Sequence, residues 1–175
     1  MRRSWERDGA DEASAAMIGR ILRAAASRRD EASRWYVDAL AAHPDWQRLR
    51  EEQVSWLAGQ GDFAAAIRSA REGLAARPAD LLAMRRLSIL LVEHGTSDVE
   101  IQEGVALVRA TIDRDPSNAF AHAALGRGLL RLGDRAGAAA SFRRAVEIAP
   151  ESEAIRAMAA EASPAKGSGA PGMPR

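Results

Sequence analysis

The residue types that most often bind metals or carry out catalysis are scattered along this sequence. Its histidines are His43, His94 and His122, and none of them forms a metal-ligand motif with a second residue at helical spacing. The sequence contains no cysteine, which excludes disulfides and thiolate ligands. We therefore expect a structural role for each histidine and no metal site.

Sequence motifs for catalysis are also absent. There is no Gly-x-Ser-x-Gly elbow, phosphate-binding loop or dinucleotide-binding fingerprint. The pair Gly126-x-Gly128 looks like part of a glycine-rich loop, but it falls inside a predicted helix, where glycines serve close packing. Carboxylates stand beside arginines in runs such as residues 28–31, which is typical of a solvated helix surface. The sequence predicts no enzymatic activity and no cofactor.

Composition and charge narrow the classes of partner. The chain of 175 residues has 47% apolar and 28% charged residues, enough to bury a core and remain in solution. A net charge of +1 argues against a nucleic-acid-binding protein, and no stretch is apolar for long enough to span a membrane. The basic N-terminus is not followed by the apolar segment of a secretion signal. We expect a cytoplasmic protein that binds neither nucleic acid nor membrane.

Prolines and glycines recur through the sequence with a common period. The prolines are spaced by 34, 38 and 34 residues, at Pro44, Pro78, Pro116 and Pro150. The glycines are spaced by 34 and 38 residues, at Gly61, Gly95 and Gly133. The two series keep in step, so the period is 34 residues, with four extra residues between Gly95 and Pro116.

Each period is punctuated as a pair of helices. A glycine follows each first amphipathic stretch, where a helix end favours left-handed backbone angles. A proline follows each second stretch, because it cannot donate the backbone hydrogen bond that continues a helix. Predicted capping residues then open the next helix, at Asp45, Asp80, Asn118 and Ser152. A helix pair this small cannot bury its apolar face alone, so the pairs must stack.

The last period carries the pattern of a known repeat. Its signature positions hold Leu125, Gly126, Leu129, Gly133, Ala138, Phe142, Ala145 and Pro150. This pattern resembles the tetratricopeptide repeat (TPR), although His122 stands where that family favours Trp. The resemblance implies an all-α fold, namely a right-handed α-solenoid of antiparallel helix pairs. A C-terminal capping helix, with Ile155, Met158 and Ala159 on one side, is expected to close it.

The resemblance divides the chain into a tail, an array and a second tail. We expect an N-terminal tail over 1–12, a TPR-like array over 13–162 and a disordered tail over 163–175. Within the array, the expected parts are the repeats 13–46, 47–80, 81–118 and 119–151 and the capping helix 152–162.

Three of the expected repeats depart from the pattern. The repeat 13–46 is degenerate, and its first helix has an apolar stripe in a shifted register, at Ile18, Ile21, Leu22 and Ala25. The repeat 47–80 has Arg50 and Gln53 at positions that are usually apolar. The repeat 81–118 holds the four extra residues, and a capping box over 97–100 predicts that its second helix begins one turn early.

The tryptophans are expected to serve packing. Trp35 and Trp56 lie within predicted helices and are expected to fill the core, whereas Trp46 can staple the junction after Pro44. Trp5 lies outside the array, where it either covers the open N-terminal edge or anchors a partner.

In TPR proteins the first helix of each pair lines a concave groove, so the resemblance implies a binding face here. Helical geometry assigns the core-facing stripes to Met84, Leu87, Leu91, Leu125 and Leu129. The stripes that remain for the groove or its rim hold Arg48, Glu51, Ser55, Leu82, Arg85, Ile89, Val92, Phe120, Ala123, Arg127, Leu130 and Arg131. The residues predicted to bind a partner are Arg48, Leu82, Arg85, Ile89, Phe120, Arg127 and Arg131. Alternatively, the curvature of the solenoid or the capping helix fills this groove.

These features favour a non-catalytic scaffold that binds a peptide or protein segment in its groove. Exposed apolar side chains beside arginines suit a partner with apolar anchors and acidic flanks. Two alternatives remain open. The protein can be a regulatory or specificity subunit of an enzyme or assembly machinery, or it can be a self-associating structural TPR protein.

Overall fold

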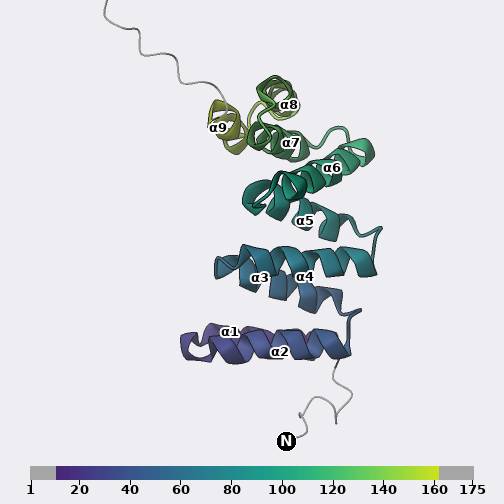
Figure 1. Ribbon diagram of the computed structural model, residues 1–175, viewed down its shortest axis with the longest axis vertical. Helices are drawn as coiled ribbons and strands as arrows, with labels where there is room; N and C mark the ends of the chain where they lie inside the picture. The colour runs from purple at the N-terminus through teal and green to yellow at the C-terminus, as the bar shows by residue number, and fades with distance from the viewer. Residues whose placement is uncertain (1–10, 162–175) are drawn as a thin grey trace, which may run out of the picture. The chain divides into compact units, whose positions relative to one another are not determined.

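In the computed structural model, residues 11–161 are described, and every regular element among them is a helix (Figure 1). The chain divides into two compact units, residues 1–95 (unit 1) and 96–175 (unit 2). Unit 1 holds α1 (Glu12–Ala24), the short 3-10 helix η2 (Ala26–Arg28), α2 (Arg29–Ala42), α3 (Gln47–Gly59), α4 (Phe63–Ala76) and α5 (Leu81–His94). Unit 2 holds α6 (Asp98–Arg114), α7 (Ala119–Arg131), α8 (Arg135–Ile148) and α9 (Glu153–Glu161). The predicted all-α class is confirmed.

Trp5 and the tail 163–175, for which the sequence predicts disorder, lie outside the described residues.

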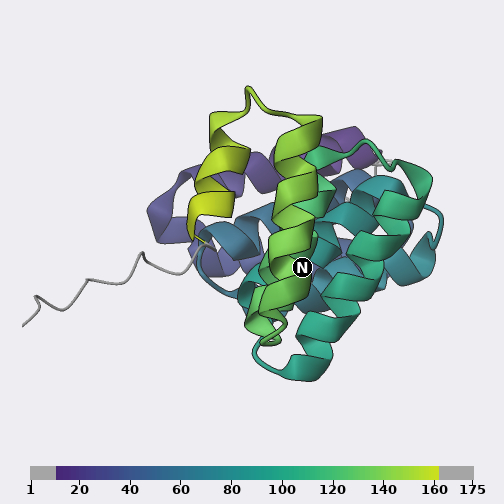
Figure 2. The same cartoon turned by 90° about the horizontal axis from the view of Figure 1, so that it is seen from above.

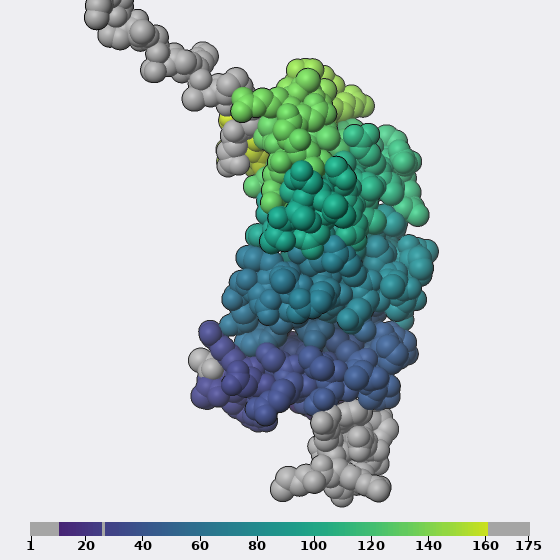
Figure 3. All heavy atoms as spheres, viewed as in Figure 1, coloured from purple at the N-terminus to yellow at the C-terminus, as the bar shows by residue number. Residues whose placement is uncertain are grey.

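Within unit 1, each helix packs on its neighbours along the chain. Figure 1 shows the pair α1 and α2 as one layer and α3 with α4 as the next. The helix α1 packs on both α2 and α3, and α4 packs closely on α3 and α5. Figure 3 shows that side chains fill the spaces between these ribbons on the face in view.

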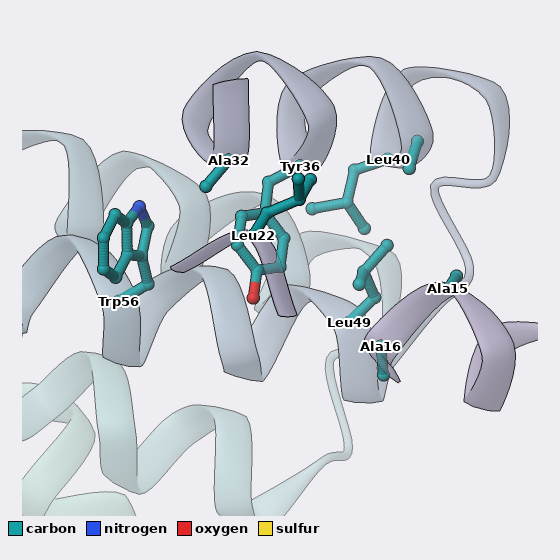
Figure 4. Packing of buried hydrophobic residues seen from close by; sticks show 9 residues of the cluster. Ala15, Ala16, Leu22, Ala32, Tyr36, Leu40, Leu49 and Trp56 are labelled. Carbon is teal, nitrogen blue, oxygen red and sulfur yellow. The ribbon is translucent and has the colours of Figure 1, made fainter. Parts of the chain in front are cut away.

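The core of the first layer is built around Tyr36. Figure 4 shows Tyr36 and Leu40 extending from α2 toward α3, which contributes Leu49 and Trp56 to the same cluster. Tyr36 is fully buried, and a Cβ atom added at Gly19 would lie 2.7 Å from its hydroxyl oxygen. Glycine is therefore required at position 19, because any side chain there would collide with the tyrosine ring.

The apolar stripe predicted for the first helix is wrong in part. Leu22 is buried, but Ile18 and Ile21 are exposed, and α1 packs instead through Ala15, Ala16 and Gly19. The reason is that α1 approaches α2 and α3 through its small residues. Among the described residues, no helix precedes α1 to cover the side where Ile18 and Ile21 lie.

Two of the three predicted turn glycines have left-handed backbone angles. The φ angles are 79° at Gly61 and 83° at Gly133, so a residue with a Cβ atom would be strained at either position. The prediction is wrong at Gly95, where φ is −55° and ψ is 138°. Here the chain leaves α5 in an extended conformation before α6, which has 17 residues against 14 in both α4 and α8.

Most helices begin at a capping side chain. Asp80 and Asn118 accept hydrogen bonds from backbone N–H groups of α5 and α7, and Ser152 accepts one from Ile155 in α9, as predicted. Ser97 accepts from the Glu100 N–H, and the Glu100 carboxylate accepts from the N–H of Thr96. This reciprocal arrangement stabilises the start of α6.

The predicted cap Asp45 is wrong, because the N-cap of α3 is Trp46, which makes no side-chain cap hydrogen bond. The N-terminal N–H groups of α3 are satisfied from another helix. The Oε1 atom of Glu12 in α1 accepts from Arg48 N at 2.6 Å and from Leu49 N at 3.2 Å. A carboxylate at a helix N-terminus also interacts favourably with the helix dipole.

Within unit 2, the pair α7 and α8 packs around Phe142. Gly126 is buried in mid-helix, and a Cβ atom there would lie 2.7 Å from the phenyl ring of Phe142. The role predicted for this glycine, close packing within a helix, is confirmed. Figure 2 shows α9 beside α8 after a tight turn. Ile155 of α9 is fully buried, with Met158 and Ala159 packed against the same cluster.

Candidate functional site

The three histidines lie at or near helix ends and contact neighbouring residues there. His43 stacks on Trp46 with ring centroids 3.9 Å apart, and His94 stacks on Phe63 at 3.5 Å. An imidazole nitrogen of His122 lies 3.1 Å from the Pro116 carbonyl oxygen. Among residues 11–161, no group of three or more His, Asp or Glu side chains is arranged to hold a metal ion.

Shifted carboxyl groups in the described chain occur at helix starts and surface pairs. The backbone N–H of Ser14 donates to Asp11 and lowers the pKa of its carboxyl group. A hydrogen bond from Arg28 lowers the pKa of Glu31. Both carboxylates are exposed and stabilised in the charged form, so neither is suited to donate a proton near neutral pH.

None of the helices in residues 11–161 is both long and apolar enough to cross a bilayer.

The helix α5 has a buried stripe and an exposed stripe. Met84, Leu87 and Leu91 are buried, which confirms the predicted packing stripe. Leu82 and Ile89 are each 43% exposed, and Arg85 lies exposed between them in sequence. Val92 is wrongly assigned to the exposed stripe, because it is fully buried near the end of the helix.

The helix α5, with its exposed stripe, is linked to the helix α3, whose matching stripe holds Arg48, Glu51 and Ser55. Arg86 joins the two helices, since its guanidinium donates to Ser55 Oγ at 2.5 Å and to the Glu51 carbonyl oxygen at 3.5 Å. We use the name α3–α5 face for the exposed or half-buried residues of these two stripes, Arg48, Glu51, Ser55, Leu82, Arg85 and Ile89. Four of them, Arg48, Leu82, Arg85 and Ile89, are predicted partner-binding residues. The structure therefore places these four on two helices of unit 1 that Arg86 links.

The remaining predicted residues lie on α7 in unit 2. Phe120 is 59% exposed, Arg131 is exposed and Arg127 is half-buried. Ala123 is fully buried, so its predicted place on the groove is wrong. The cause is the close approach of helices through small residues in this repeat, which takes Ala123 into the core around Phe142.

Unit 1 also contains a cleft that the sequence did not predict. A cleft of about 340 Å³, here called the outer cleft, lies between α2, α3 and α4. It is lined by Ser33, Val37, Leu40, Ala41, Arg50, Gln53, Trp56, Leu57, Ala65, Arg68, Ser69 and Glu72. On α4 these residues recur every three or four positions, so the cleft runs along one face of that helix.

The floor of the outer cleft is polar where the repeat pattern is apolar. Arg50 is buried and donates to Glu72 at 2.7 Å, and its Cδ atom would lie 2.7 Å from a Cβ atom at Gly73. Gln53 is also buried, and its Oε1 atom accepts from Ser69 Oγ at 2.6 Å. In the sequence, the only indication of this polar floor was that Arg50 and Gln53 stand at positions that are usually apolar in the repeat.

Comparisons with known proteins show which solved structures share this fold. Residues 119–152 match the family model of the tetratricopeptide repeat. No curated protein matches the chain in sequence. The crystal structure of YrrB, described as a TPR protein with an unusual peptide-binding site, is 18% identical with a TM-score of 0.70. That match covers 90% of this chain and 78% of YrrB.

Two other solved structures show the same fold. MamA from Desulfovibrio magneticus RS-1 is 19% identical with a TM-score of 0.66, over 85% of this chain and 83% of MamA. TTC0263, a thermophilic TPR protein of Thermus thermophilus, is 21% identical with a TM-score of 0.60, over 87% of this chain and 81% of that one. Residues 119–152 thus carry a tetratricopeptide repeat, and the chain as a whole shares the fold of solved tetratricopeptide repeat proteins.

Proposed function

We propose that this protein is a non-catalytic scaffold whose α3–α5 face holds a peptide or protein segment. The observation that carries the proposal is the pair Leu82 and Ile89, two large apolar side chains exposed on the stripe of α5 opposite its core. Contiguous exposed apolar surface on a folded protein commonly marks an interaction site. A cytoplasmic location belongs to the same proposal, since a chain without cysteine needs no oxidising compartment to fold.

The charges on this face favour a partner with acidic residues. Arg48 and Arg85 are exposed cations on the α3–α5 face, while Glu51 is half-buried. An arginine can hold a carboxylate through two parallel hydrogen bonds, which gives both attraction and orientation. A segment with two apolar anchors for Leu82 and Ile89 and a carboxylate for Arg85 would match the chemistry of the face.

The peptide-binding description of YrrB supports a peptide as the ligand class, because that protein shares the fold. In unit 2, we propose the same kind of role for Phe120, Arg127 and Arg131 on α7. Phe120 supplies the exposed apolar side chain there.

The proposal is tested by reversing the charge of Arg85. Tagged full-length protein, wild type or Arg85→Glu, is used to capture partners from the native cell, and mass spectrometry measures their amounts. We expect partner recovery to fall at least tenfold, with helical content by circular dichroism unchanged. Equal recovery with the folded variant would contradict a role for this face.

Arg68→Glu is a matched control for this experiment. Arg68 is also an exposed arginine of unit 1, but it lines the outer cleft and not the α3–α5 face. We expect recovery with this variant to equal that of the wild type. Loss with Arg68→Glu but not with Arg85→Glu would assign partner binding to the outer cleft instead.

The two other roles give different results in solution. A self-associating structural protein would show a mass that rises with concentration in light scattering, and Arg85→Glu would return it to the monomer. A regulatory subunit would recover an enzyme among its captured partners and change the activity of that enzyme when added back.

A further inference from the structure

The outer cleft of unit 1 contains two buried hydrogen-bond donors that lack an acceptor. Arg50 is 5% exposed and Trp56 is 8% exposed, and both residues line the cleft. Within the described part of the chain, Arg50 Nε and Trp56 Nε1 have no hydrogen-bond partner. Both nitrogen atoms carry an N–H that can only donate, so each is satisfied only by an acceptor.

The next repeat shows that helix packing does not require these donors. One 34-residue period after Arg50 and Trp56, the sequence has Met84 and Leu90, and both are buried in α5. The same two positions can therefore be filled by apolar side chains. Because an unpartnered buried donor costs free energy, polar residues at such positions are typical of functional sites.

The size and lining of the cleft suit a small ligand. Its volume of about 340 Å³ lies in the lower part of the usual range for small-molecule sites, about 300–1,000 Å³. Apolar side chains from all three helices line it, namely Val37, Leu40, Ala41, Leu57 and Ala65. Figure 4 shows the indole of Trp56 extending from α3 toward Ala32 of α2. An apolar ligand body would contact these walls.

The charges of the cleft favour a carboxylate. Among its lining residues, Arg50 and Arg68 are cations and Glu72 is the anion. Glu72 accepts from Arg50 Nη1 at 2.7 Å, but its side chain is 68% exposed, against 6% for that of Arg50. An exposed carboxylate loses little when it turns into water, so a ligand carboxylate can replace it on the buried guanidinium.

We propose that the outer cleft binds a small organic carboxylate that has an apolar body and an acceptor oxygen at its far end. The ligand carboxylate pairs with the guanidinium of Arg50 and gives its Nε–H an acceptor. Trp56 follows six residues later, about 9 Å along α3, so its indole N–H is offered to the second oxygen. This site is distinct from the α3–α5 face, because Arg50 and Trp56 are buried on another side of α3.

Nuclear magnetic resonance tests the site with three matched probes. They are 7-oxooctanoate, octanoate, which lacks the keto oxygen, and 2-octanone, which lacks the carboxylate. In nitrogen-15-labelled full-length protein, the N–H signals of Arg50 and Trp56 are identified by their loss in Arg50→Met and Trp56→Phe.

We expect 7-oxooctanoate to shift both N–H signals saturably and octanoate to bind about threefold more weakly, because one hydrogen bond is lost. We expect 2-octanone to shift neither signal. Failure of 7-oxooctanoate to shift the two signals, or equal affinity for 2-octanone, would overturn the proposal.

Three variants test the assigned contacts. Arg50→Met should lower the affinity for 7-oxooctanoate by about tenfold, and Trp56→Phe should remove its advantage over octanoate. Glu72→Gln should raise the affinity by about threefold, because it removes the competing carboxylate. A gain of affinity cannot come from damage to the fold, so weaker binding by a folded Glu72→Gln variant would contradict the proposed exchange.

Arg143→Met is the control for general attraction of anions, because Arg143 is an exposed arginine of α8 in unit 2. We expect it to leave the affinity for 7-oxooctanoate unchanged. An equal loss in Arg143→Met and Arg50→Met would overturn the proposal. Partner capture through Arg85 is measured separately, so the failure of one proposal is distinguished from the failure of the other.

Discussion

Unit 1 and unit 2 use the same kind of helix pair but differ in the chemistry of their cores. In unit 2, the cluster around Phe142 is formed by alanine, leucine, valine and isoleucine side chains. In unit 1, buried polar side chains of α3 lie beside the apolar cluster around Tyr36. Within residues 11–161, the buried side-chain atoms that have no hydrogen-bond partner are Tyr36 Oη, Gln47 Oε1, Arg50 Nε, Glu52 Oε2 and Trp56 Nε1. All of these atoms belong to unit 1.

The repeat therefore tolerates polar residues in its core, but we expect them to lower the free energy of unfolding. A buried polar atom without a partner typically costs about 1–3 kcal/mol, because it loses its hydrogen bonds with water. We therefore expect unit 1 to open more readily than unit 2. Hydrogen exchange measured by mass spectrometry can follow α1–α5 and α7–α9 separately and can test this order.

The largest expected effect comes from removing the aromatic centre of unit 2. Phe142→Ala should lower the free energy of unfolding by about 3–5 kcal/mol, the usual cost of emptying a buried phenylalanine site. It should also make α7–α9 exchange faster than α1–α5 and so reverse the order of the two units. Urea unfolding and hydrogen exchange provide the two measurements. A loss below about 1 kcal/mol would mean that the core of unit 2 is not the better packed one.

The next effect concerns the cap that joins α1 to α3. Glu12→Ala leaves the N–H groups of Arg48 and Leu49 without their acceptor, so we expect a loss of about 1–2 kcal/mol in the free energy of unfolding. Faster exchange should be confined to unit 1. Glu31→Ala is the control, because Glu31 only pairs with Arg28 on the surface. An equal change with both variants would refute the capping role.

A third substitution should make unit 1 more like unit 2. Arg50→Met removes a buried guanidinium with an unpartnered Nε atom, and Glu72, its ion-pair partner, is exposed enough to regain hydration. Replacing such a buried ion with an apolar side chain of similar length should raise the free energy of unfolding by about 1 kcal/mol. Arg68→Met, at an exposed arginine nearby, should leave it unchanged. Thermal unfolding of the two variants decides this, and destabilisation by Arg50→Met would show that the polar floor stabilises the fold.

The smallest effect concerns the tyrosine hydroxyl, and it depends on pH. Burial raises the pKa of Tyr36, so unit 1 holds its phenol in the neutral form. The contribution of this neutral phenol to the free energy of unfolding is complete below the unfolded-state pKa of about 10. It is lost as the pH rises through the pKa of Tyr36 in the folded protein. Tyr36 is the only tyrosine of the chain, so absorbance at 295 nm reports its ionisation directly.

We expect Tyr36→Phe to be neutral or to stabilise the protein by up to about 1 kcal/mol at pH 7, because it removes an unpartnered hydroxyl. We also expect it to abolish the part of the alkaline loss of stability that accompanies the phenol titration. An absorbance titration of the native wild type with a midpoint near pH 10 would show instead that the phenol reaches water.

Much of the architecture could be predicted because it is encoded locally. The period of prolines and glycines predicts the helix pairs, and the spacing of apolar residues assigns Met84, Leu87 and Leu91 to the core of α5. The same reasoning failed at Val92 and Ala123, which lie on the predicted groove side but are buried. Helix periodicity gives the direction of a side chain, whereas its burial also depends on how closely the next helix approaches.

The candidate site, like the architecture, was predictable only where it depends on the geometry of a single helix. The residues of α5 that form the exposed stripe follow from helical geometry, but the link through Arg86 to Ser55 and Glu51 depends on the packing of two helices. The outer cleft could not be predicted, since it arises from the positions of α2, α3 and α4 relative to one another.

From the sequence alone we could derive the all-α repeat, its 34-residue period and the need for glycine at the turns at Gly61 and Gly133. The packing of the helices, in contrast, determines that Glu12 caps α3, that Arg50 and Gln53 are buried beside a cleft, and that Ile18 and Ile21 of α1 are exposed. The physical reason is the range of the interactions. Turns, caps and amphipathic faces are set by residues a few positions apart, whereas these later features depend on helices brought together from distant parts of the chain.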